Sequence, residues 1–112
     1  MKIDIRFRGL EGSDALREHI IRRLHFKLSR FKRKVTSVLV RIGDVNGPRG
    51  GVDKRCHVTV SGPTLPSTNI QDLNADAYTA VDLAVERAGH AVARVLGRTR
   101  AVNRAPTPAP PW

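Results

Sequence analysis

The hydrophobic period changes from two residues to about four within the first thirty-one positions, and this change constrains the fold more than any other feature. Residues 2–8 alternate between apolar and charged side chains, a pattern typical of a half-buried strand. Residues 16–31 instead repeat apolar side chains at steps of four and three, which predicts one face of a helix of about four to five turns. The apolar positions of this helix are Leu16, Ile20, Leu24, Leu28 and Phe31.

The rest of the chain predicts three more strands and a second helix. Residues 35–42 and 54–61 alternate and are rich in β-branched side chains, so we expect a hairpin whose long tip is the Gly- and Pro-containing loop 46–51. A weaker pattern predicts a short strand over 67–73. Apolar side chains at helical spacing then run from Tyr78 to about Leu96, where the second helix should end near a glycine.

Polar residues that can cap helices stand where the two helical patterns start. Ser13 or Asp14 can cap the first helix, and Asn74 or Asp76 the second, because their side-chain oxygens can accept hydrogen bonds from free amides of the first turn.

The predicted order is β-α-β-β-β-α. This order favours an α+β, two-layer fold: a four-stranded mixed sheet with both helices on one face. A right-handed crossover through the first helix makes the first two strands parallel neighbours. The 112 residues suffice for one domain, which we place at 1–100. Residues 101–112 hold four of the seven prolines and are expected to form a disordered Pro-rich tail.

The charge of the chain predicts a polyanionic partner. Twenty Lys and Arg stand against ten Asp and Glu, which gives a formal net charge of +10. Nucleic acid is the first candidate for such a surplus, and an anionic membrane the second. Most of the basic residues are Arg, whose planar fork matches phosphate well.

The basic residues gather in the two helices. Residues 17–34 carry eight of them and one acid, Glu18, and the second helix carries a stripe at helical spacing. The helix dipole accounts for part of this pattern, but the excess in the first helix favours a phosphate-binding groove between the helices. With one Arg at the hairpin tip, the predicted RNA-binding residues are Arg22, Arg23, Lys27, Arg30, Lys32, Arg33, Arg49, Arg87, His90, Arg94 and Arg98.

The opposite face of the sheet is a second candidate surface. It is also basic but lacks the aromatic side chains on which a sheet of the RNA-stacking kind holds bases. The choice between the helix face and this open face stays open. Its predicted basic residues are Lys2, Arg6, Arg8, Arg41, Arg55 and His57.

Few residues suggest catalysis or metal binding. The single cysteine, Cys56, alternates with valines and is expected to be a core residue. No spacing pairs a nucleophile with a base or gathers ligands for a metal. We therefore expect no enzyme, no cofactor, no metal and no small-molecule substrate. The N-terminus lacks the apolar run of a signal peptide and no segment suits a membrane span, so we expect a soluble, cytoplasmic protein that does not bind membranes, most simply a monomer.

The predicted order and three segments resemble a known family. Asp14–Glu18 opens the first helix, Asp76–Asp82 opens the second, and Asp44–Cys56 spans a Gly-rich hairpin tip. In this order they resemble the ribosome hibernation-promoting factor family, also called the ribosome-associated inhibitor or sigma-54 modulation protein family, over about residues 1–100. The chain looks like the short form of the family, without the extra C-terminal domain of long members.

The resemblance implies binding to 16S rRNA of the small ribosomal subunit, in the channel used by mRNA and tRNA, and inhibition of translation during stress or stationary phase. By position it implies contacts from both helices. His90 stands where the family usually has an Arg. The implied contact residues are Arg22, Arg23, Lys27 and Arg30 in the first helix, and Arg87, His90, Arg94 and Arg98 in the second.

Two other functions remain open beside a ribosome-binding factor. One is a general binder of structured RNA. The other is a protein-interaction regulator of transcription, whose binding should survive high salt, whereas phosphate binding should weaken steeply. An enzyme, such as a nuclease, is the most distant alternative.

Overall fold

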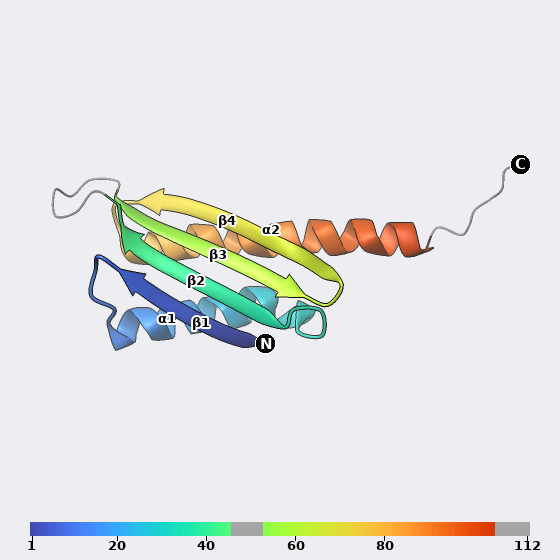
Figure 1. The fold of residues 1–112 in the computed structure, drawn as a ribbon, viewed down its shortest axis with the longest axis horizontal. Coiled ribbons are helices and arrows are strands. Elements are labelled where there is room, and N and C mark those ends of the chain that lie inside the picture. The colour runs from blue at the N-terminus through green and yellow to red at the C-terminus, as the bar shows by residue number, and fades with distance from the viewer. Residues whose placement is uncertain (46–52, 105–112) are drawn as a thin grey trace, which may run out of the picture.

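The computed structural model describes residues 1–45 and 53–104 of the chain, with side chains as far as residue 97. It forms a four-stranded mixed sheet covered on one face by two helices (Figure 1). This confirms the predicted α+β fold and its order. The elements are β1 (Lys2–Arg8), α1 (Asp14–Leu28), the 3-10 turn η1 (Ser29–Phe31), β2 (Ser37–Asp44), β3 (Lys54–Gly62), β4 (Leu65–Asn74) and α2 (Ala77–Arg104).

The strands lie in the order in which they occur in the sequence, β1-β2-β3-β4. β1 is parallel to β2, with Ile5 opposite Val40, as the crossover through α1 requires. β2 and β3 form the predicted antiparallel hairpin, and β4 adds antiparallel to β3. One face of this sheet therefore lies against the helices and the other is open.

The hydrophobic core lies between the sheet and the helices. The inward side chains of β2 and β3 alternate, as Val38, Val40 and Ile42 do in β2. They pack against a stripe of four side chains on α1 and against the small residues of α2. The α1 stripe is fully buried, so the spacing of four residues did mark the core face. It consists of Leu16, Ile20, Leu24 and Leu28.

Two elements extend further than the sequence indicates. β4 starts at Leu65 and has ten residues, because pairing with β3 stabilises a segment whose own apolar pattern is weak. The prediction that the second helix ends near Leu96 is wrong: α2 continues through Gly97 to Arg104. A glycine inside a helix costs only about 1 kcal/mol, and the first helix-breaking proline stands at 106. Residues 101–104, placed in the predicted tail, belong to this helix, and 105–112 lie outside the described residues.

The base of the β2–β3 hairpin is held by an ionic cluster. Lys54 Nζ donates to Asp53 Oδ1 at 2.9 Å and to Asp44 Oδ2 at 3.3 Å. These carboxylates, Asp53 first, raise the pKa of Lys54. The Val45 amide also donates to the Asp53 carbonyl at 2.8 Å. The hairpin tip, with Arg49, lies outside the described residues.

The thiol of Cys56 is predicted to be nearly inert in the folded protein. Burial, helped by the nearby Asp72 carboxylate, raises its pKa from 9.0 to about 12. At pH 8 the reactive thiolate is then about a thousandfold scarcer than in an unfolded chain. We expect labelling by a thiol reagent at pH 8 to be slower by at least that factor in the native protein than in the same protein unfolded in guanidinium. Equal labelling rates would show that Cys56 is not a core residue.

Candidate nucleic-acid interface

The basic face of α1 follows from how the helix is capped and buried. Ser13 caps it, since its Oγ accepts a hydrogen bond from the Leu16 amide at 3.0 Å. With its apolar stripe turned to the sheet, the remaining positions of α1 face α2 or solvent. Arg22 and His25 are exposed, and so are Arg30 of η1 and the turn that follows it. The core packing of α1 thereby turns its positive charge outward.

A groove between the helices, the interhelix groove, forms where the end of α1 passes the middle of α2. It has a volume of about 310 Å³ and is bordered by Phe26, Lys27, Ser29, Arg30, Gly89 and His90. A Cβ placed on Gly89 would lie 3.6 Å from Cβ of Lys27. The backbone of α2 therefore lies close beside the Lys27 stem, and three predicted RNA-binding residues meet here: Lys27, Arg30 and His90.

The N-terminal parts of the two helices are joined by an acidic residue, Asp82 of α2. Its Oδ1 lies 2.7 Å from Nε2 of His19 and 3.3 Å from Nε of Arg23. Because a carboxylate can only accept, His19 donates through Nε2. The His19 ring also packs edge-on against Tyr78, with centroids 5.0 Å apart. Arg23 is thus largely engaged within the protein, which its place in the sequence did not indicate.

Arg87, a predicted RNA-binding residue of α2, points to the sheet edge and not into the groove. Its Nη1 donates to Asp72 Oδ2 at 2.8 Å and to the Gln71 carbonyl at 2.9 Å, both in β4. Its side chain is still 56% exposed, so one edge of the guanidinium faces solvent. The charge of Arg87 is nevertheless balanced by a neighbouring carboxylate.

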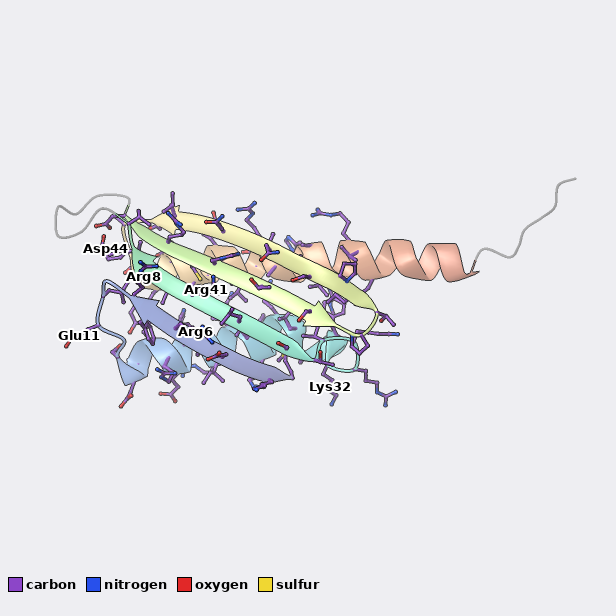
Figure 2. The ribbon with its side chains drawn as sticks, viewed as in Figure 1. Arg6, Arg8, Glu11, Lys32, Arg41 and Asp44 are labelled. Carbon is purple, nitrogen blue, oxygen red and sulfur yellow. The ribbon has the colours of Figure 1, made fainter. Side chains whose placement is uncertain are left out.

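The other predicted residues divide into exposed cations and residues beyond the described side chains. Arg94 is exposed on α2, and the two predicted cations in the turn after η1, Lys32 (labelled in Figure 2) and Arg33, are exposed as well. Arg49 lies outside the described residues, and for Arg98 the structure describes only the backbone, within α2. Six of the predicted cations have no hydrogen bond or ion pair to a carboxylate anywhere in the described part of the chain: Arg22, Lys27, Arg30, Lys32, Arg33 and Arg94.

An exposed aromatic residue, Phe26, lies among these cations and was not singled out from the sequence. Its side chain is 73% exposed. The guanidinium of Arg23 lies 5.6 Å and the ammonium of Lys27 5.9 Å from its ring centroid. A flat exposed ring flanked by cations can stack on an unpaired base while the cations hold the phosphates. In the sequence, Phe26 lies outside the apolar stripe of α1, and this position was the signal that its ring would be exposed.

The start of α2 is set by Asp76. Its Oδ2 accepts from the amide of Thr79 at 3.0 Å and from the Thr79 hydroxyl at 2.8 Å. These hydrogen bonds lower the pKa of Asp76. Asp76 is therefore a capping residue, and Asn74 supports it by accepting from the Asp76 amide at 2.9 Å.

The described residues include neither a cluster of metal ligands nor a helix suited to a membrane. There, no group of three or more His, Cys, Asp or Glu side chains is placed to hold a metal ion. None of the helices in that part of the chain has the length and apolar character that crossing a membrane requires. The geometry provides a set of outward cations beside a groove, and an arrangement of this kind suits phosphate as a ligand.

Comparison with solved structures shows which class of protein has this fold. A ribosomal subunit interface protein from Coxiella burnetii is 21% identical, with a TM-score of 0.75; the alignment covers 87% of this chain and 99% of that one. The N-terminal domain of Protein Y from Thermus thermophilus is 25% identical, with a TM-score of 0.69, covering 84% and 98%. The first of these likenesses shows the fold alone.

Comparison with family models identifies the family. Residues 3–100 match the family described as sigma 54 modulation protein / S30EA ribosomal protein. The chain belongs to this family, which confirms the resemblance stated from its sequence. No match was found among curated proteins.

Proposed function

We propose that this protein is a non-catalytic, cytoplasmic factor that binds 16S rRNA of the small ribosomal subunit in the mRNA and tRNA channel and inhibits translation during stress or stationary phase. The family to which the chain belongs supports a ribosomal partner. The observation that carries the proposal is the set of exposed cations on α1, η1 and the following turn, without carboxylate partners among the described residues and next to the interhelix groove.

The proposed mechanism is occlusion by a folded domain. Each unpaired Lys or Arg can replace a counterion condensed on the RNA, and the release of these counterions drives binding. Lys27 and Arg30 on one side of the groove and His90 on the other would hold rRNA phosphates, with Phe26 against an unpaired base. The bound domain would then exclude mRNA and tRNA by its volume, and a monomer suffices for this.

The residues engaged within the protein take smaller roles in this proposal. Asp82 holds Arg23 and Asp72 holds Arg87, so each cation would contribute to RNA binding mainly through its exposed edge. Lys32 and Arg33 would extend the phosphate contacts beyond the groove. Arg49, Arg94 and Arg98 remain proposed contacts on the strength of charge and family position.

Binding to purified small subunits, compared with binding to plain duplex RNA at equal salt, tests the proposal. We expect sedimentation with small subunits at about 150 mM salt and weaker binding to the duplex by at least tenfold, because a folded rRNA site matches the groove and a uniform helix does not. Both affinities should fall steeply as salt rises. Equal affinities would favour a general RNA binder, and salt-resistant binding would favour a protein-interaction regulator.

A further inference from the structure

The open face of the sheet carries a second concentration of positive charge, far from the interhelix groove. A hollow of about 790 Å³ lies over β1, β2 and β3. Figure 2 shows Arg6, Arg8 and Arg41 at this face, on the side of the sheet away from the helices. We call it the sheet-face hollow; the side chains used in the argument are Arg6, Arg8, Arg41, Asp44, Arg55 and His57.

The strand register places like charges directly opposite each other in this hollow. Arg6 stands opposite Arg41, which is the pair of like charges, and His57 stands on the other side of Arg41, so one row of nitrogen-bearing side chains crosses three strands. Side chains opposite each other on one face lie about 5 Å apart at Cβ, and like charges there destabilise a sheet. Arg8 and Arg55 flank the next row, on either side of Gly43. Folding does not account for this arrangement, since it works against stability.

Few carboxylates offset these cations. Asp4 Oδ2 forms an ion pair with Arg6 Nη2 at 3.1 Å, and at the rim Asp44 Oδ2 forms one with Lys54 Nζ at 3.3 Å. Arg8, Arg41 and Arg55 have no ion pair or hydrogen bond within the described residues. All three are exposed. An anion with several charges, held across the rows, would remove the repulsion and satisfy the guanidinium donors.

We propose that the sheet-face hollow is a second RNA-binding surface, which takes the phosphates of a single-stranded RNA backbone. It lies on the side of the domain opposite the interhelix groove, so one molecule can hold two RNA segments. This goes beyond the proposed function, which needs the groove alone. Phe7 borders the hollow but packs against the core on the helix side, and the His57 ring is engaged by Asn69. No Phe, Tyr or Trp ring therefore stands outward on the described open face, and the hollow would bind the backbone without reading bases. Charges at its centre disfavour a protein partner, because the centres of protein interfaces are depleted in charged residues.

The test uses a background in which the groove is disabled, Lys27→Glu/Arg30→Glu. A labelled single-stranded RNA of about 10 nucleotides, within the size of known single-strand sites, is titrated by fluorescence anisotropy at low salt. We expect residual binding that weakens at least tenfold when Arg8→Gln/Arg41→Gln/Arg55→Gln is added. The matched control, Arg17→Gln/Lys34→Glu in the same background, lowers the net charge by the same three units at exposed positions away from the open face and should change the affinity less than threefold.

Two further measurements make the test decisive. Because neutralising the arginines removes repulsion between strands, the triple variant should melt at the same or a higher temperature than its background. Loss of RNA binding together with unfolding would overturn the proposal, as would equal effects of the triple variant and its control. An oligo-glutamate with the same charge as the RNA serves as a second competitor. If it displaces the labelled RNA as effectively as unlabelled RNA does, the proposal is also overturned. Failure of the wild-type protein to bind small subunits would overturn the proposed function. The titrations with single-stranded RNA would still test the sheet-face hollow.

Discussion

The variant Lys27→Glu/Arg30→Glu is expected to bind small ribosomal subunits about a hundredfold more weakly than the wild-type protein. Both cations border the interhelix groove and neither has a carboxylate partner among the described residues. A hydrogen bond to a charged group contributes about 1.5 kcal/mol or more, so losing two such contacts costs about 3 kcal/mol, a factor of about one hundred. Co-sedimentation at a series of protein concentrations measures this change.

The matched control is Lys2→Glu/Arg17→Glu, which also replaces one Lys and one Arg. Both residues are exposed, and the guanidinium of Arg17 lies over the Phe7 ring at 5.3 Å, away from the groove. We expect a change of less than fivefold, through the long-range field alone. The salt dependence separates the two variants further: losing two phosphate contacts should reduce the slope of log affinity against log salt by about two. Equal losses in both variants would show that only net charge matters and that the groove is not the site.

The substitution Gly62→Ala is expected to be the most destabilising single-methyl change in the described part of the chain. A Cβ on Gly62 would overlap the backbone carbonyl oxygen of Lys34, and the Lys34 carbonyl carbon would lie only 2.9 Å away. Backbone atoms cannot rotate aside as the end of a side chain can. The neighbouring Thr36 amide also donates to the Ser61 carbonyl at 2.9 Å, which holds the two segments together. Overpacking of this kind costs about 3 kcal/mol.

Thermal unfolding followed by circular dichroism measures the effect. A loss of about 3 kcal/mol should lower the melting temperature by at least about 12 °C for a domain of this size. Gly97→Ala is the control with the same chemical change. Apart from its chain neighbours and the nearby backbone of α2 itself, nothing lies within 4 Å of a Cβ at that position, so the substitution should leave stability unchanged or raise it by about 0.5 kcal/mol, since alanine favours helix. A melting temperature of Gly62→Ala within 3 °C of wild type would contradict the predicted clash.

The strand and helix order could be predicted because each element repeats its apolar residues at its own period. Alternation in β1 and the four-residue steps in α1 report which side chains turn to the core. The prediction was weakest where neighbours supply the stability. β4 has a poor pattern of its own and is stabilised by β3, and the position at which α2 ends depends on helix propagation up to the first proline rather than on Gly97.

The candidate site could be predicted as a charged region but not as a set of free cations. The excess of Lys and Arg in residues 17–34 is visible in the sequence. Asp82, which the sequence places only at the end of the segment that opens the second helix, accepts a hydrogen bond from His19 and forms an ion pair with Arg23, both of the other helix. The exposed ring of Phe26 was also missed, because an aromatic residue in a helix is usually counted as core.

By itself, then, the sequence determined the β-α-β-β-β-α order, the core face of each element and the surplus of positive charge, because periodicity and composition are local properties of the chain. Only the tertiary structure decided which cations are available to a ligand. Arg23 and Arg87 meet carboxylates from other elements, whereas Lys27 and Arg30 remain beside an open groove. The physical reason is that ion pairing acts over a few ångströms, and separations of that size between distant residues are set by how helices and strands pack.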